Sequence, residues 1–161
     1  MWRAVLALLL ALSLSGPAAA GPFEDGVAAY ATGDYATAVS LWRPLAEQGH
    51  AEAQISLGVM YADGLGVPED DAEAVRWWRL AAEQGLAAAQ YNLGFMYANG
   101  KGVPQDYVQA HLWLNLSASL QTDPEKRAAI VWYRDLVSGS MTPEQIGEAQ
   151  RLAREWRARL Q

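Results

Sequence analysis

The 161-residue sequence contains no cysteine, only two histidines, and 12 basic against 18 acidic residues. Without cysteine, neither a disulfide nor a lipid-modified cysteine can form, so the fold must be stable by packing alone. The formal net charge of −6 argues against nucleic acid as the main partner, because surfaces that bind nucleic acids are basic. Beyond the N-terminal segment, no apolar run is long enough to cross a membrane, and we predict no stable membrane insertion of the mature protein.

Sequence motifs of common enzymes are also missing. The chain has no H-E-x-x-H, G-x-S-x-G, C-x-x-C or P-loop pattern. His50 falls in an expected turn and His111 on an expected helix, and neither has a recurring acid or nucleophile beside it. Ser138 and Ser140 flank a glycine but have no histidine nearby in the sequence. We therefore predict no catalytic residues, no metal site and no cofactor.

The first 20 residues differ from the rest of the chain. Trp2 and Arg3 form a short basic start, and the run from Ala4 to Leu14 is apolar except for Ser13. A Gly-Pro break and three alanines follow, which is typical of a secretory signal peptide cleaved after about Ala20. We expect the protein to be exported, either to the periplasm or out of the cell. The alternative is an uncleaved anchor, although the run is shorter than the roughly 20 residues that a spanning helix needs.

The remaining chain contains an internal repeat of 36 residues. Twelve residues between positions 53 and 70 return 36 positions later, among them Leu57 as Leu93 and Pro68 as Pro104. The same offset relates residues 34–49 to residues 70–85. A fixed period in this range is the signature of a solenoid, in which each unit buries its apolar face against the next.

Helix signals recur with this period. Glycines mark helix ends, and Asp70 with Glu73, like Asp106 with Gln109, predicts a capping box. The expected helices are 23–32, 34–48, 51–63, 70–83, 87–99, 106–119, 124–137 and 143–160. We predict an all-α fold, an α/α superhelical solenoid of antiparallel helix pairs with a C-terminal capping helix pair. The expected parts are the signal peptide 1–20, a solenoid 21–121 with units of about 23–49, 50–85 and 86–121, and capping helices 122–161.

The segments AEAQISLGVMYADGLGVPEDDAEAVRWWRLAAEQG and AAAQYNLGFMYANGKGVPQDYVQAHLWLNLSAS closely resemble the Sel-one-like repeat family, relatives of the tetratricopeptide repeats. The resemblance covers roughly residues 23–119, with the elements A-x-A-Q-x-x-L-G-x-M-Y and G-x-G-V-P-x-D each present twice. The first unit lacks G-x-G-V-P. The resemblance implies an α/α superhelix that acts as a protein–protein scaffold, commonly in exported bacterial proteins. A cysteine-rich branch of the family is associated with β-lactam binding and hydrolysis, whereas this chain has no cysteine.

By resemblance to tetratricopeptide repeats, the first helix of each pair lines the concave face. Alignment of the Leu-Gly pairs places eight residues there: Glu52, Ile55, Val59, Asp63, Ala88, Tyr91, Phe95 and Asn99. The four bulky apolar residues among them do not belong to the shared repeat pattern, so a ligand explains them better than packing does. We predict a groove with an apolar floor and an acidic rim. It suits a protein or peptide segment with hydrophobic anchors and flanking Lys or Arg.

Three alternatives stay open at this point. The C-terminal helices could fold back and bury the concave side chains. The protein could be a fixed subunit of a larger envelope complex, docked through its groove or its C-terminal tail. By family association it could also be a cell-wall or β-lactam hydrolase, since groups distant in sequence can still meet in space.

Overall fold

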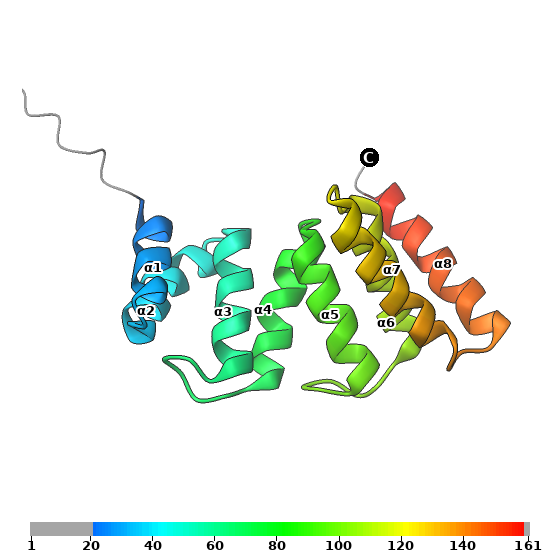
Figure 1. Cartoon of the computed structure of the whole chain (residues 1–161), viewed down its shortest axis with the longest axis horizontal. Helices are drawn as coiled ribbons and strands as arrows, with labels where there is room; N and C mark the ends of the chain where they lie inside the picture. The colour runs from blue at the N-terminus through cyan, green and yellow to red at the C-terminus, as the bar shows by residue number, and fades with distance from the viewer. Residues whose placement is uncertain (1–20, 160–161) are drawn as a thin grey trace, which may run out of the picture.

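The computed structural model describes residues 21–159, and in that range the chain forms eight α-helices and no strand (Figure 1). They are α1 (Pro22–Ala31), α2 (Tyr35–Glu47), α3 (Ala51–Asp63), α4 (Asp71–Glu83), α5 (Ala87–Asn99), α6 (Tyr107–Leu120), α7 (Pro124–Ser138) and α8 (Pro143–Ala158). The all-α prediction is confirmed, and every expected helix is present. The expected signal peptide lies outside the described residues. Within these residues, no helix is both long and apolar enough to span a bilayer.

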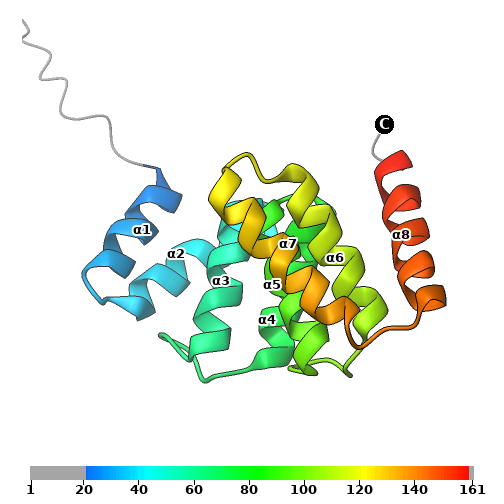
Figure 2. The same cartoon turned by 45° about the vertical axis from the view of Figure 1, so that its right-hand side comes forward.

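The helices form a row of stacked hairpins. Within the hairpins, α1 packs against α2, α3 against α4, and α5 against α6, while α2–α3 and α4–α5 contacts join one hairpin to the next. Figures 1 and 2 show the row running from α1 at one end to α8 at the other. Leu57 of α3 and Leu93 of α5 are both fully buried, one repeat apart. The predicted solenoid is confirmed, since each hairpin buries its apolar side chains against its neighbours.

A glycine of the first helix lies against a tryptophan of the second helix in two of the hairpins. A Cβ atom on Gly58 would lie only 2.2 Å from Nε1 of Trp78, and one on Gly26 only 2.3 Å from Nε1 of Trp42. The Trp78 indole N–H donates a hydrogen bond to the backbone oxygen of Ile55 at 3.2 Å. The glycine therefore leaves the room that the indole needs to reach the backbone of the facing helix.

In the third hairpin, leucine replaces tryptophan at the same crossing. A Cβ atom on Gly94 would lie 2.8 Å from Cγ of Leu114 and 3.2 Å from the backbone oxygen of Ala110. Gly58 and Gly94 therefore both lie at close crossings between the two helices of their hairpins. Leucine has no donor, so this crossing is held by packing without the indole hydrogen bond.

The predicted capping boxes at α4 and α6 form only one of their two hydrogen bonds, so this prediction is wrong for the other one. The Asp70 carboxylate accepts a hydrogen bond from the backbone N–H of Glu73, as expected. However, the backbone N–H of Asp70 donates to the backbone oxygen of Tyr61, and that of Asp106 donates to Tyr97. The preceding helix has therefore already satisfied the donor that the box would use.

After the third hairpin, α7 takes the place of a further first helix. It begins 37 residues after the start of α5, which begins 36 residues after the start of α3. The seventh residue of α7, Ile130, is buried, as are the seventh residues of α3 and α5, Leu57 and Leu93. The sequence repeat ends near Gln121, but the arrangement of the backbone continues through α7.

The last helix, α8, covers a different side of α6 (Figure 2). Both α7 and α8 pack against α6, but they barely touch one another. Ala149, Ala153 and Trp156 form the buried stripe of α8, and the Trp156 ring meets Trp113 of α6 edge-on at 6.2 Å. The two helices expected after the repeats are thus present, but they cover two sides of α6 and do not pack together as a hairpin.

Candidate partner-binding surface

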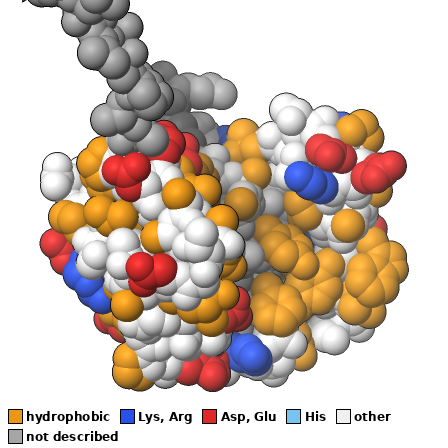
Figure 3. Space-filling model, turned by 60° about the vertical axis from the view of Figure 1, so that its left-hand side comes forward, with side chains coloured by type: hydrophobic (Ala, Val, Ile, Leu, Met, Phe, Trp, Pro, Cys, Tyr) orange, Lys and Arg blue, Asp and Glu red, His pale blue; other side chains and the backbone are white. Residues whose placement is uncertain are grey.

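The eight residues predicted for partner binding lie on α3 and α5, and each keeps part of its surface accessible. Ile55, Val59 and Tyr91 are partly buried. The exposed ones are Glu52, Asp63, Ala88, Phe95 and Asn99. Figure 3, which brings the N-terminal end of the molecule forward, shows hydrophobic side chains gathered around a hollow in the surface.

Ile55 and Val59 line a pocket between α1 and α3. Its volume is about 280 Å³. The remaining lining residues are Val27, Tyr30, Trp42 and Ser56. Except for two hydroxyl groups, these walls are apolar. The α3 half of the predicted surface is therefore an open recess that can accept an apolar side chain.

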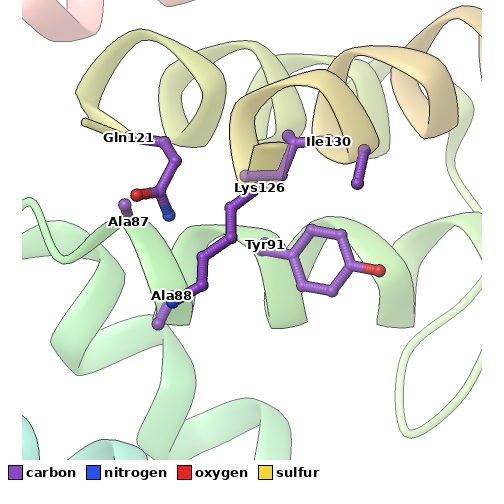
Figure 4. Close-up of a pocket in the computed structure, with 7 residues that line it drawn as sticks. Ala87, Ala88, Tyr91, Gln121, Lys126 and Ile130 are labelled. Atoms are coloured by element: carbon purple, nitrogen blue, oxygen red, sulfur yellow. The ribbon is translucent and has the colours of Figure 1, made fainter. Parts of the chain in front are cut away.

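Ala88 and Tyr91 line a second pocket, between α5 and α7 (Figure 4). Its volume is about 270 Å³. The remaining lining residues are Ala87, Gln121, Lys126, Ala129 and Ile130. In Figure 4, the Lys126 side chain extends from α7 toward Ala88 on α5. This pocket combines residues from the repeats with residues that follow them, and the sequence did not predict it.

The α7 helix contacts three of the predicted residues through Tyr133. The Tyr133 ring lies 6.3 Å from the ring of Tyr91 and 6.0 Å from that of Phe95. The Asn99 side-chain amide donates to the Tyr133 hydroxyl at 2.9 Å, so this amide is already engaged within the chain. Burial raises the pKa of Tyr133 above its ordinary value. The alternative in which the C-terminal helices fold back and bury the concave side chains holds only in part, because α7 contacts Tyr91 and Phe95 but leaves Phe95 38% exposed.

Two exposed apolar residues extend the surface beyond the predicted set. Val27 of α1 is 46% exposed, and it follows the crossing glycine of its helix, as Val59 and Phe95 follow theirs. Trp132 is 67% exposed and is the ninth residue of α7, as Val59 is of α3 and Phe95 of α5. We call Val27, Val59, Phe95 and Trp132 the concave row. Counting from helix starts would have identified Trp132, but the extra residue before α7 breaks the 36-residue period.

Charges at the ends of the first helices are mainly acidic. Glu52, Asp63 and Glu125 are exposed, and a carboxylate oxygen of Glu52 lies 3.4 Å from Nδ1 of His50. Lys126 brings a positive charge to the α5–α7 pocket, and within residues 21–159 its ammonium group forms no ion pair. The surface thus offers acidic edges near α3 and a basic group between α5 and α7.

The histidines and the serine that could in principle serve in catalysis have structural roles or are buried. Nδ1 of His50 accepts a hydrogen bond from the backbone N–H of Ala53 at 3.3 Å, which caps α3. His111 is buried in α6, and this burial lowers its pKa. The Ser138 hydroxyl donates to the backbone oxygen of Arg134 at 3.0 Å. Among the described residues, no group of three or more His, Asp or Glu side chains is placed to hold a metal ion.

Comparison with protein families identifies the repeat. The model of the Sel1 repeat matches residues 23–50, 51–86 and 87–122. The chain is also similar to the "exopolysaccharide production negative regulator" of Rhizobium leguminosarum bv. viciae, with 39% identity over 80 residues. That match covers 41% of this chain and 30% of the relative, so the chain spans about a third of the relative's length.

Two solved structures resemble this one. A protective antigen of uropathogenic Escherichia coli with an SLR fold superposes with a TM-score of 0.76 and 31% identity, over 84% of this chain and 29% of that chain. A Sel1 repeat protein from Oxalobacter formigenes superposes with a TM-score of 0.52 and 36% identity, over 53% of this chain and 25% of that one. Both neighbours share the repeat architecture, and each is considerably longer than this chain.

Proposed function

The chain belongs to the Sel1 repeat family, and from this we propose that it is a scaffold that holds a segment of a partner protein on its concave face. The observation that carries this proposal is the concave row of four apolar residues at equivalent positions of α1, α3, α5 and α7. Three of them are exposed, Val27 by 46%, Phe95 by 38% and Trp132 by 67%. Apolar side chains gathered on an open surface are costly in water unless a partner covers them, so such patches mark interaction sites.

The arrangement of the row suggests how the partner segment runs. The row places one residue on each of α1, α3, α5 and α7. A segment that contacts the whole row therefore crosses these four helices and presents an apolar side chain to each of them.

The charges suggest the flanks of that segment. Glu52 and Asp63 lie at the two ends of α3, on either side of the pocket that Ile55 and Val59 line. A partner with Lys or Arg beside its apolar anchor pairs with these carboxylates. Pairs of this kind in solvent contribute mainly to association rate and orientation.

A scaffold is a better explanation of this chain than a hydrolase. His50 caps α3, the Ser138 hydroxyl is bonded to its own helix, and His111 is buried. A nucleophile and a base need to lie within hydrogen-bond reach of one another, and these groups have other partners or positions. From the Rhizobium and Escherichia relatives we carry over only the repeat scaffold. Exopolysaccharide regulation, which the name of the Rhizobium relative states, is one process that such a scaffold can serve.

We also propose that the scaffold works outside the cytoplasm. The support is the sequence pattern of residues 1–20, together with a fold that needs no disulfide. In the envelope, the chain would act either as a free adaptor or as a fixed subunit of a complex. Co-purification at a constant ratio through successive columns would favour the fixed subunit.

The test is affinity capture from an envelope extract with matched variants. Phe95→Ala and Trp132→Ala remove anchors of the row, whereas Leu80→Ala removes an equally exposed apolar side chain on α4, outside the row. Loss of an interface anchor costs about 1–4 kcal/mol of binding free energy. A protein that is captured by the parent and by Leu80→Ala, but lost with the row variants, supports the proposal. Equal capture by all four chains would refute it.

A further inference from the structure

We propose that the pocket between α5 and α7 binds the C-terminal residue of the partner segment, with its apolar side chain inside and its carboxylate at Lys126. This inference rests on the proposed function, because the same segment then continues along the concave row. The pocket has a volume of about 270 Å³. Pockets for drug-sized ligands are larger, about 300–1,000 Å³, so this one suits a single residue.

The walls of the pocket are apolar. Ala87 and Ala88 of α5 face Ala129 and Ile130 of α7, and the Tyr91 ring lies along the pocket (Figure 4). Ile130 is itself buried, so the pocket reaches down to the packed contact between α7 and the hairpin before it. A bulky apolar side chain such as Leu, Ile or Phe would replace water against these walls, which is favourable.

The polar side-chain groups of the pocket that remain available can all donate a hydrogen bond, and among them only the Tyr91 hydroxyl can also accept one. Oε1 of Gln121 already accepts from the backbone N–H of Asp123 at 3.1 Å, and its backbone oxygen accepts from Arg127 at 2.8 Å. The Gln121 side-chain NH₂ and the Lys126 ammonium group are left as donors. No carboxylate lines the pocket, although the chain has an excess of acids. A set of donors with a positive charge and no carboxylate complements an anion, and a carboxylate accepts from both amide and ammonium donors.

A peptide C-terminus unites the two required groups on one carbon atom. Its side chain and its carboxylate both attach to the last Cα, so the side chain can fill the pocket while the carboxylate stays at the mouth. An internal Asp or Glu has a carboxylate but no apolar group beside it. The pocket also lies next to the concave row, because Tyr91 precedes Phe95 by one turn of α5, and both rings meet Tyr133. The residues before the C-terminus therefore have a surface to lie on.

Short synthetic peptides with randomised C-terminal residues test this inference, each made as the free acid and as the C-terminal amide. Binding to the mature chain is followed by fluorescence anisotropy. We expect free acids ending in Leu, Ile or Phe to bind about tenfold or more tightly than their amides, because a hydrogen bond between charged groups is lost in the amide. Lys126→Gln should remove this difference, whereas Lys101→Gln, which changes an exposed lysine of the α5–α6 loop, should keep it.

A second variant tests the apolar part of the pocket. Ala88→Leu fills the space between α5 and α7 from an exposed helix position, and it should weaken the free-acid peptides without unfolding the chain, as circular dichroism would show. Equal affinity of acids and amides overturns the inference, and so does a preference that survives Lys126→Gln. If 3-phenylpropanoate alone binds as tightly as the peptides, the site takes a small acid and the inference fails as stated.

These outcomes separate the inference from the proposed function. If amides and acids bind equally, and Phe95→Ala or Trp132→Ala still weakens both, the concave row binds peptides and only the C-terminal site is wrong. If no peptide in either form binds while the row variants still lose a captured envelope protein, the inference again fails and the scaffold proposal stands. If neither peptide binding nor capture depends on the row, both fail.

Discussion

Replacing Gly58 by alanine should destabilise the fold, although alanine is the better helix former. The added Cβ would lie 2.2 Å from Nε1 and 2.5 Å from Cδ1 of Trp78, and the indole must move. Overpacking a core costs about 1–3 kcal/mol, and losing the hydrogen bond from Trp78 to Ile55 costs about 0.5–1.5 kcal/mol more. The gain in helix propensity offsets about 0.5–1 kcal/mol. We expect a net loss of about 0.5–4 kcal/mol from a folding free energy of about 5–15 kcal/mol.

Urea denaturation followed by circular dichroism measures this loss, and two further glycines serve as controls. Gly147 lies in α8 with no atom within 4 Å of its Cβ position, so Gly147→Ala should stabilise the chain by about 0.5–1 kcal/mol. The free energy of unfolding of Gly94→Ala should lie between those of the other two variants. Its added Cβ would lie 2.8 Å from the side chain of Leu114, which can rotate. The reasoning would be refuted if Gly58→Ala were as stable as the parent, or if the three variants ranked in another order.

The remaining predictions concern the surface, the termini and pH. Phe95→Ala and Trp132→Ala should change the melting temperature little, because both side chains are exposed; early melting would show that they pack against the core instead of a partner. Mass spectrometry of the protein from the cell envelope should find Gly21 as the first residue, and a predominance of intact Met1 would contradict the predicted cleavage. Burial, with Arg134 nearby, lowers the pKa of His111 below 6.5. The unfolded chain therefore binds more protons at this site, so the free energy of unfolding should be highest above pH 6.5 and fall below it. His111→Val should flatten this fall in urea titrations at different pH values, and an unchanged pH dependence would disprove the assignment to His111.

The local signals in the sequence were sufficient for the helices and their stacking. The aspartates at positions 70 and 106 and the Thr142-Pro143 pair start helices, and each acts on backbone groups within a few residues. The 36-residue period then indicated that the units stack on one another. Both conclusions depend on spacing along the chain, which the sequence contains directly.

The predicted binding surface stays a prediction, but the structure places its residues on α3 and α5 with part of their surface accessible, and it adds Val27 and Trp132 at equivalent positions. Ile55, Val59 and Phe95 could be found because they vary inside a repeated pattern that fixes their orientation. Val27 was missed because the first unit is shorter than the others, and Trp132 because the pattern ends near residue 121. The Asn99 amide proved to be bonded to Tyr133, a residue 34 positions away, and no rule of local spacing predicts such a contact.

The sequence by itself determined that this chain is a solenoid of helix hairpins, because caps, glycines and a fixed period act locally or between adjacent units. Only the tertiary structure decided where α7 and α8 go. Both are ordinary amphipathic helices, and each could have packed against the other as a hairpin. Instead α6 is buried on both sides, by Ile130 and Val137 of α7 and by Ala153 and Trp156 of α8. That choice placed Trp132 at the α7 position that corresponds to Phe95 of α5, and it created the α5–α7 pocket. The physical reason is burial of apolar surface, because each of the two helices packs its apolar stripe against buried side chains of α6.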